Sequence, residues 1–333
     1  MQTFSEPALI LLILLAVIFD FLNGVHDSSN IVATMIASRA FTPRVALGVT
    51  SIAHFVAPFL FGVAVATTIG EDIIDADAIN NGVIIAALLS AILWNLFTWF
   101  VGIPSSSSHA LVGGLIGAVA VGAGLQAIYL DGMVKVLIAL FISPIIGFIG
   151  GFLFTKLILF LAKGASLRIN WFFKRSQIIT SITLALSHGT NDAQKTMGII
   201  TLGLVTSGFL DTFYVPLWVI TISAGAIALG TAMGGWRLIK TLGGKFYKIR
   251  PVDAFSAQAT STVVILGASL VGEPVSTTQV ISSSIMGVGS AERLSKVRWG
   301  VGRDIAIAWL VTIPVTALLA AGIYWILVLI AIA

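Results

Sequence analysis

The sequence predicts an all-α integral membrane protein built from two similar halves that cross the membrane in opposite directions. The chain has 333 residues, of which 58% are hydrophobic and 10% are charged, whereas soluble domains carry roughly 25% charged residues. Apolar runs of about 20 residues, the length that spans a bilayer as a helix, recur along the chain. Two polar motifs interrupt these runs in the first half and recur in the same order in the second half.

Ten membrane segments are predicted, in two sets of five. The N-terminal apolar run has no basic stretch before it and no evident cleavage site, so we expect the first membrane helix there rather than a signal peptide. Several segments are long enough to be kinked or split, and we expect about 10–12 transmembrane helices, some of them broken. The first repeat is predicted at 1–165, a cytoplasmic linker at 166–177 and the second repeat at 178–333. The segments are expected at 7–37, 45–69, 81–101, 105–124, 133–162, 178–204, 215–236, 253–271, 275–290 and 304–332.

The basic residues predict the orientation. Of the 18 Lys and Arg residues, all except Lys135, Lys156 and Lys195 fall in loops on one side of the predicted segments, and the other side is mostly acidic. Because basic loops stay in the cytoplasm, we expect both termini to lie outside the cell. The pI near 9.5 then reflects topology rather than nucleic-acid binding. The absence of cysteine excludes disulfides and thiolate metal sites.

Two pairs of motifs carry the repeat. NGVHDSSN at 23–30 matches HGTNDAQK at 188–195, and GIPSSSSHALVGGLIGA at 102–118 matches GEPVSTTQVISSSIMGV at 272–288. The first half is predicted to begin outside and end inside, and the second half does the reverse. Inverted repeats of this kind are typical of secondary transporters, whose site lies near the membrane midplane where the repeats meet. We therefore expect broken helices and hairpin-like polar loops at that depth.

The first motif pair places carboxylates and amides at membrane depth, where ionisable groups are costly and usually face the bundle interior. Their spacing in the first half puts them on one helical face. Carboxylate and amide oxygens, with backbone carbonyls freed by helix breaks at Gly24 and Gly189, are ligands that sodium accepts. A purely structural role, knitting helices together, is the alternative. Lys195 is expected to pair with a carboxylate. The expected sodium ligands are Asp20, Asn23, Asp27, Asn30 and Asp192, with the ion held chiefly by Asn23, Asp27 and Asp192.

The second motif pair places hydroxyls after a Gly-x-Pro, at the start of an apolar segment. Proline favours the first turn of a helix and hydroxyls favour its cap, so each run is expected to open a helix whose N-terminus attracts an anion. Simple helix capping is the alternative. Two such ends could clasp one tetrahedral oxyanion. Neighbouring carboxylates favour protonated phosphate over sulfate, because a carboxylate accepts a hydrogen bond from P–OH. Glu273 and Gln279, at the second run, are left open as ligands.

GTNDAQKTMG at 189–198 closely resembles the signature of the inorganic phosphate transporter (PiT) family of sodium- or proton-coupled phosphate symporters, in which it occurs once per half. The first copy here is GVHDSSN, with His26 where the family usually has Asn, and the PSSSSHA and PVSTTQ loops also fit. The resemblance implies an inverted-repeat fold, homodimers and co-transport of phosphate with a cation. It places cation and phosphate contacts on the signature residues Asp27, Asn30, Asn191, Asp192 and Gln194. The implied phosphate ligands are Ser105, Ser106, Ser107, Asn191, Gln194, Ser276, Thr277 and Thr278.

Together these features predict a cell-membrane transporter that imports inorganic phosphate by sodium-coupled symport with alternating access. It is expected not to be an enzyme and to need no cofactor. Its expected partners are phosphate, sodium ions, the lipid bilayer and a second copy of the chain. A proton-coupled phosphate or sulfate permease on the same fold is the main alternative, and an anion channel is another. A hydrolase using Ser108 and His109 is disfavoured because adjacent helical residues point in different directions. His54, His109 and His188 are interpreted as helix-packing groups, with proton sensing as the alternative for His109 and His188, which adjoin the motifs.

Overall fold

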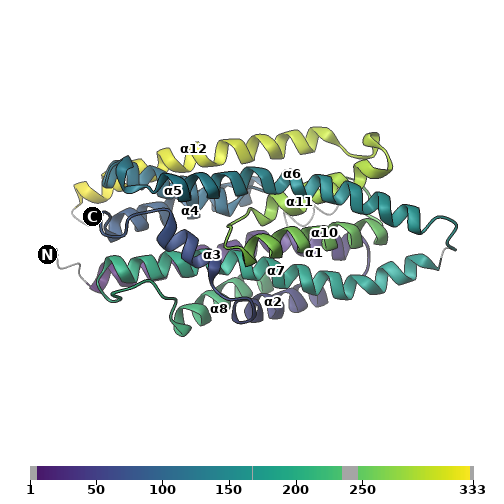
Figure 1. The fold of residues 1–333 in the computed structure, drawn as a ribbon, viewed down its shortest axis with the longest axis horizontal. Coiled ribbons are helices and arrows are strands. Elements are labelled where there is room, and N and C mark those ends of the chain that lie inside the picture. The colour runs from purple at the N-terminus through teal and green to yellow at the C-terminus, as the bar shows by residue number, and fades with distance from the viewer. Residues whose placement is uncertain (1–5, 167, 235–246, 331–333) are drawn as a thin grey trace.

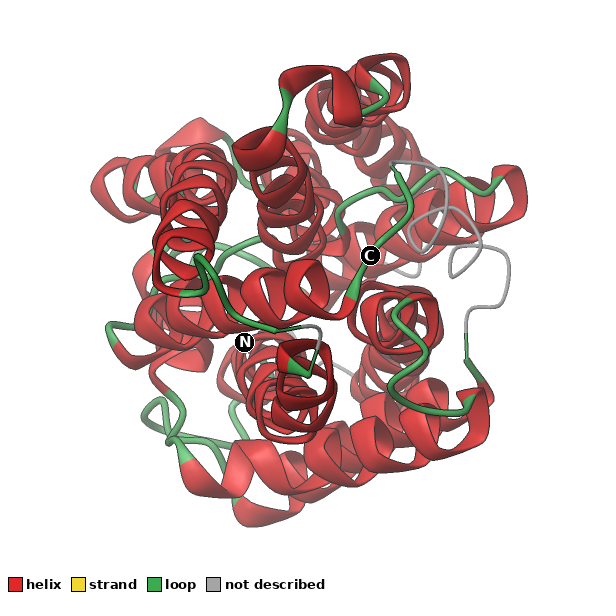
Figure 2. Ribbon diagram, turned by 90° about the vertical axis from the view of Figure 1, so that its right-hand side faces the viewer, coloured by secondary structure: helices red, strands yellow, loops and turns green. Residues whose placement is uncertain are grey.

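Helices account for the regular structure of residues 6–166, 168–234 and 247–330, which this computed structural model describes, and no β-strand occurs among those residues (Figures 1 and 2). Ten helices have at least 16 residues, and each falls on one of the ten predicted segments. They are α1 (Glu6–Ala37), α2 (Pro43–Leu60), α4 (Asn81–Val101), α5 (Ser107–Gly122), α6 (Leu130–Leu161), α7 (Ile169–Thr206), α8 (Leu217–Met233), α10 (Pro251–Leu270), α11 (Thr277–Glu292) and α12 (Trp299–Leu329). The short elements are α3 (Ala64–Thr67), η1 (Thr68–Asp72), η2 (Leu125–Ala127) and η3 (Leu294–Lys296).

The lengths and composition of the helices confirm the all-α membrane class. Within the described residues, five helices are long and apolar enough to cross a membrane: α1, α2, α4, α6 and α12. Both chain ends lie at the same end of the bundle, at the left of Figure 1, while the turn between α6 and α7 lies at the opposite end. α7 begins at Ile169, so most of the predicted linker 166–177 is helical. Arg237, Lys240 and Lys245, which helped to predict the orientation, lie outside the described residues.

The predicted segment 45–69 is interrupted, in line with the expectation that some of the long segments are split. Three residues separate α2 from the single turn of α3. The side chain of Gln194, on α7, bonds the backbone at this break. Its Oε1 accepts the N–H groups of Val65 (2.8 Å) and Ala66 (3.3 Å), and its Nε2 donates to the carbonyl of Gly62 (2.8 Å). Because an unpaired buried backbone group is costly, this amide stabilises the start of α3.

The two motif helices are continuous, which corrects the prediction that they break at Gly24 and Gly189. α1 and α7 run through these positions as α-helix. A Cβ at Gly24 would lie 2.3 Å from the carbonyl oxygen of Ile227 in α8, and one at Gly189 would lie 2.9 Å from the Cα of His54 in α2. The two glycines therefore allow close approach of neighbouring helices, as small residues do in membrane bundles. They do not free carbonyls for a cation.

Two helical hairpins, α4–α5 and α10–α11, carry the hydroxyl runs. Gly102 (φ 77°) ends α4 and Gly272 (φ 82°) follows α10, in a left-handed conformation that glycine adopts without strain. The chain then reverses direction within a few residues, and the side chains of Ser106 and Ser276 cap α5 and α11. Both hydroxyl runs therefore lie at helix N-termini, as the sequence predicts.

The two halves of the chain interlock. α1 packs along α8 and α7 along α2, while α5 packs along α12 and α6 along α11. The helices of the two halves correspond in chain order: α1, α2, α4, α5 and α6 of the first half correspond to α7, α8, α10, α11 and α12 of the second. Each half therefore needs helices of the other half to bury its polar helix, which is α1 in the first half and α7 in the second.

Buried apolar side chains form two separate clusters, one towards each end of the bundle. On α1, Phe19 belongs to the cluster nearer the chain ends and Ile31 to the other. On α7, Met197 belongs to the cluster nearer the chain ends and Leu184 to the other. The polar motifs of both helices lie between these residues. The fold therefore places its polar residues in a layer that apolar side chains close on both sides.

Candidate functional site

The four polar motifs meet in this interior layer. α1 and α7 supply the carboxylates, and the N-terminal hydroxyls of α5 and α11 contact them. All thirteen candidate ligands that the sequence predicts are buried, with exposed fractions of 3% or less. The structure thus brings together side chains that are up to about 250 residues apart in the chain, for example Asp27 and Thr278.

Asp27 on α1 is held by hydroxyls of both hairpins. Its Oδ1 accepts hydrogen bonds from Thr278 Oγ1 (2.8 Å) and Asn30 Nδ2 (2.9 Å), and its Oδ2 accepts one from Ser107 Oγ (3.2 Å). Ser107 Oγ also lies 2.7 Å from Asn23 Oδ1, so its single proton is shared between Asn23 and Asp27. Among the described residues, no lysine or arginine forms an ion pair with Asp27. Hydroxyl, amide and imidazole groups therefore surround its carboxylate.

Asp192 on α7 is paired with a cation of the chain itself. Lys195 Nζ forms an ion pair with its Oδ1 and also donates to Ser108 Oγ (2.7 Å) and to the carbonyl of Val275 (3.0 Å). Thr277 Oγ1 donates to Asp192 Oδ2 at 2.9 Å. The expected pairing of Lys195 with a carboxylate is thus present. The lysine also joins the tips of the two hairpins, because Ser108 and Val275 belong to different ones.

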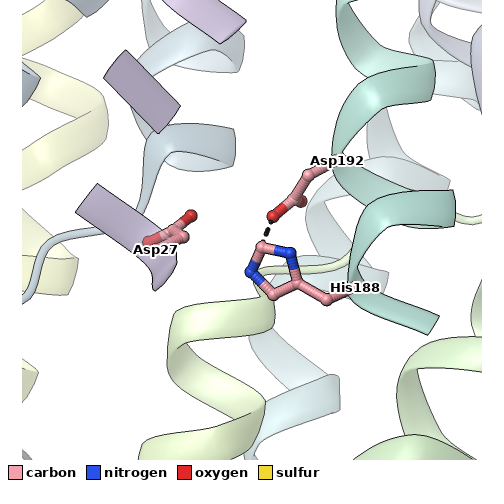
Figure 3. A group of neighbouring side chains, drawn as sticks. All are labelled: Asp27, His188 and Asp192. Atoms are coloured by element: carbon pink, nitrogen blue, oxygen red, sulfur yellow. Dashed lines mark ion pairs between the residues drawn. The ribbon is translucent and has the colours of Figure 1, made fainter. Parts of the chain in front are cut away.

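His188, interpreted from the sequence as a packing group, belongs to the site. Its Nε2 lies 3.1 Å from Asp192 Oδ2. Asp27, His188 and Asp192 point toward one another, and each offers a ligand atom within 4.8 Å of the other two, a spacing that one metal ion can bridge (Figure 3). His26 Nδ1 lies 3.1 Å from Asp27 Oδ1. The sequence did carry a signal for His188, since it precedes Asp192 by four residues and so shares its helical face.

The N-termini of α5 and α11 open at the site. Ser106 Oγ accepts the N–H of His109 (3.1 Å), and Ser276 Oγ accepts the N–H of Gln279 (3.3 Å). Each cap satisfies one of up to four N–H groups that a helix N-terminus leaves without an intrahelical partner. The positive ends of two helix dipoles therefore lie beside the carboxylates, an arrangement that suits a bound anion. Helix capping and anion binding are compatible here, because the caps leave donors free.

Several buried oxygens of the site have no hydrogen-bond partner among the residues that the structure describes. They are both carboxylate oxygens of Asp20 and the amide oxygens of Asn30 and Asn191. An ionised carboxylate without a partner at membrane depth is costly, so it needs a cation or a proton beside it. The donor set consists of carboxylate and amide oxygens, which fits a hard monovalent cation such as sodium.

Three predicted phosphate ligands have their hydrogen-bonding groups engaged elsewhere. The side-chain amide of Gln194 bonds the start of α3, and its phosphate role stays a prediction. Ser105 Oγ lies 2.7 Å from Thr98 Oγ1 of α4, and Asn191 Nδ2 donates to Ser269 Oγ of α10 (2.9 Å). Ser105 and Asn191 therefore fix the hairpins to their neighbours, while the amide oxygen of Asn191 stays unpaired.

The formal charges of the site are unbalanced. If Asp20, Asp27, Asp192 and Lys195 are all ionised and the histidines are neutral, the formal sum is −3 + 1 = −2. All four side chains are buried. An anion would be repelled by this excess unless cations neutralised it first. Two monovalent cations would remove the excess before an anion adds its own charge.

An all-helical membrane bundle whose interior combines cation ligands with two facing helix N-termini has the architecture of a membrane transport protein. Two stretches of the chain, residues 23–172 and 162–320, match the phosphate transporter family. The chain therefore belongs to the phosphate transporter family, as the signature motif predicts, and it is not an enzyme.

Individual relatives agree with this assignment. The chain is 46% identical over 322 residues, 96% of either chain, to a protein of Bacillus subtilis (strain 168) described as a probable low-affinity inorganic phosphate transporter. It is 42% identical over 325 residues, 97% of either chain, to a protein of Rhizobium meliloti (strain 1021) with the same description. A solved structure described as the sodium-dependent phosphate transporter superposes with a TM-score of 0.88 over 98% of this chain and 100% of that one, at 24% identity, and thus has the same fold.

Proposed function

We propose that the protein imports inorganic phosphate across the cell membrane by sodium-coupled symport. Family membership and the described relatives support phosphate as the substrate. Sodium is supported by the oxygen ligands around Asp20 and Asp27 and by the excess of two negative charges. The description of the structural neighbour as sodium-dependent points the same way.

The observation that carries the proposal is that the hairpin hydroxyls donate to the carboxylates. Ser107 and Thr278 donate to Asp27, and Thr277 donates to Asp192. A hydroxyl has a single proton, so it cannot donate to a carboxylate and to phosphate at the same time. When sodium binds Asp27, the cation replaces the hydroxyl protons as the partner of the carboxylate. The hydroxyls then turn to the anion, and sodium binding raises the affinity for phosphate.

The charge count gives a stoichiometry. Two sodium ions would balance the excess of two negative charges, and one monovalent phosphate would bind between the hairpins. Each cycle then carries one net positive charge inward. Membrane voltage would drive such a cycle with about 2.3 kcal/mol per charge per 100 mV.

Alternating access belongs to the same proposal. The two apolar clusters close the site towards both ends of the bundle, so transport requires each to open in turn. The interlocked helix pairs support an inverted repeat with halves at 1–165 and 178–333, which would rock against each other around the site. We place both termini outside the cell, on the basis of the basic loops. A homodimer is proposed from the family resemblance alone.

Uptake into reconstituted vesicles tests the proposal. Labelled phosphate should accumulate above its external concentration when sodium is higher outside, and should not when potassium replaces sodium. Sulfate at the same concentration should not accumulate. Equal phosphate uptake with and without a sodium gradient would contradict sodium coupling, and uptake that never exceeds equilibrium would indicate a channel.

One observation favours proton coupling as the second candidate. His26 contacts Asp27 and His188 contacts Asp192, so imidazoles adjoin both motif carboxylates. Concentrative uptake driven by an inward pH gradient in sodium-free medium would establish this candidate in place of the sodium symporter.

A further inference from the structure

A buried glutamine joins three helices at the far end of the bundle, which is the end opposite the chain termini. Oε1 of Gln177 on α7 lies 2.7 Å from Oγ of Ser38, the residue that follows α1. Its Nε2 donates to the carbonyl of Pro251, the first residue of α10 (3.2 Å). The Gln177 side chain is fully buried, so hydrogen bonds hold α1, α7 and α10 together at this depth.

A second buried glutamine joins the same helices nearer the carboxylates. Nε2 of Gln258 on α10 donates to Thr34 Oγ1 on α1 (3.0 Å), and its Oε1 accepts a hydrogen bond from Thr180 Oγ1 on α7 (2.6 Å). The two threonines lie about one helical turn from Ser38 and Gln177 on the same helices. The far end therefore contains two adjacent layers of amide hydrogen bonds among its apolar side chains.

The repeat places a leucine at the position that matches Gln177. The matched motifs on α1 and α7 begin at residues 23 and 188, an offset of 165 residues. At this offset Leu12 corresponds to Gln177, and Gly203 corresponds to Ser38. The matching pair is also in contact, because a Cβ at Gly203 would lie 2.7 Å from Cδ1 of Leu12. The same contact is therefore polar at the far end and apolar at the end that carries the chain termini.

The position that matches Gln258 is also a leucine. α4 begins at Asn81 and α10 at Pro251, an offset of 170 residues, so Leu88 corresponds to Gln258. Leu88 is fully buried in the apolar cluster nearer the chain ends. Asn81 donates to Ser207 Oγ (2.7 Å) two turns further from the site. This end therefore has leucines at the depth where the far end has amides.

Water acts differently on the two closures. An amide that is exposed when helices separate exchanges its hydrogen bonds in the protein for hydrogen bonds to water, so the net cost is small. A leucine that is exposed loses its burial and gains nothing in return. The far end should therefore open more readily than the end that carries the chain termini.

We propose that Gln177 and Gln258 are gate residues that make the far end of the bundle the side to which the substrate-free site opens more often. Such a gate rests on the alternating access of the proposed function, but it requires no particular coupling ion. Because we place both chain ends outside the cell, this gate faces the cytoplasm, where imported phosphate is released.

Cysteine reactivity measures the opening of each closure, because the chain has no cysteine of its own. Ser181→Cys lies one turn from Gln177 toward the site, and Ala16→Cys lies one turn from Leu12 in the matching position; both positions are fully buried. The probe is a charged methanethiosulfonate, applied in detergent without sodium or phosphate, and each rate is divided by that of the unfolded variant. Ser181→Cys should react at least about 10-fold faster than Ala16→Cys. Equal rates, or faster reaction of Ala16→Cys, would overturn the proposal.

Replacing both glutamines tests the gate residues themselves. Ser181→Cys combined with Gln177→Leu and Gln258→Leu should react at least about 10-fold more slowly than Ser181→Cys alone. The hydroxyls that contact the two amides also have carbonyl acceptors on α1 and α7, so the leucines leave none of them without a partner. Gln126→Leu, the same change at an exposed position, is the control and should leave the rate unchanged. Equal rates in the control and the glutamine variant would contradict the gate.

The converse substitution gives a result even where the double variant does not fold. Leu12→Gln buries an amide without a partner, which destabilises the closed form, so Ala16→Cys should react at least about 10-fold faster with this substitution. No increase in a variant that melts as a folded protein would contradict the gate. Vesicle uptake separates this outcome from the proposed function. Equal cysteine rates in a protein that accumulates phosphate with sodium refute only the gate, and unequal rates in a protein without sodium coupling refute only the symport.

Discussion

Asp27 and Asp192 occupy matching positions in the two halves of the chain, yet the protein compensates their charges differently. Asp192 has the ammonium of Lys195 as an ion-pair partner, in addition to the Thr277 hydroxyl and the His188 ring. Asp27 has hydroxyl, amide and imidazole partners, and no ion pair with lysine or arginine among the described residues. One half therefore carries its own cation at the position where the other half has none.

This difference between Asp27 and Asp192 indicates which carboxylates need a cation from outside the protein. A buried ion pair is already neutral, and breaking it leaves an uncompensated charge. Within the described part of the chain, neither Asp27 nor Asp20 forms an ion pair with lysine or arginine. We therefore propose that sodium binds mainly on the α1 side of the site and that the ion pair on α7 is structural. Four sets of substitutions test whether Asp27 and Asp192 differ in this way.

The largest effect is expected for Asp27→Asn. The substitution keeps the shape of the side chain and removes the charge that attracts the cation, so concentrative phosphate uptake should fall by at least about 100-fold. The variant should remain folded, because its partners are neutral donors. Phosphate uptake into vesicles would check the loss of transport, and melting curves in detergent would check that the variant is folded. Normal sodium-driven accumulation would remove Asp27 from the cation site.

The pair on α7 should behave as a structural unit. Asp192→Asn or Lys195→Met alone leaves one charge buried without its partner and should destabilise the protein by about 3–5 kcal/mol. The double variant removes both charges and should recover much of that loss. Melting curves of the two single variants and the double variant test this. A double variant as unstable as the sum of the singles would show that the ion pair is not the source of the effect.

Removing hydroxyls at the tip of α11 should weaken phosphate binding less severely. Thr277→Val and Thr278→Val keep the volume but each removes one donor to the anion, worth about 1.5–3 kcal/mol, so phosphate affinity should fall roughly 10- to 100-fold. Ser283→Ala on the same helix is the matched control, because Ser283 donates to carbonyls of its own helix. Phosphate affinities of the threonine variants equal to that of the control would favour simple capping.

The smallest effect is expected for an exposed carboxylate. Asp304 lies 3.6 Å from Arg303, and their side chains are 68% and 77% exposed. Exposed ion pairs contribute little, so Asp304→Asn should change the free energy of unfolding by less than about 1 kcal/mol and leave uptake unchanged. A large loss of stability or uptake in Asp304→Asn would mean that carboxylate substitutions act through general destabilisation. The result for Asp27→Asn would then not identify a cation ligand.

The sequence predicts the elements and most of the site because those features are local. Long apolar runs mark the helices, and the carboxylates of α1 and α7 stand out in them. Gly-x-Pro patterns followed by a run of hydroxyl residues mark the hairpin tips. Gln194 could not be placed in this way, because its role depends on the break after α2, which lies more than 100 residues earlier. The continuity of α1 at Gly24 likewise depends on its contact with Ile227 of α8, which no local pattern contains.

The most direct test of the account is the affinity of the purified protein for phosphate, measured by isothermal titration in sodium and in potassium buffers of equal ionic strength. If sodium at Asp27 releases the hydroxyls of Ser107 and Thr278 to the anion, phosphate should bind about 10-fold or more tightly in sodium, and phosphate should raise sodium affinity by the same factor. Asp27→Asn should abolish the difference. Equal affinities of the wild-type protein for phosphate in the two buffers would contradict the coupling.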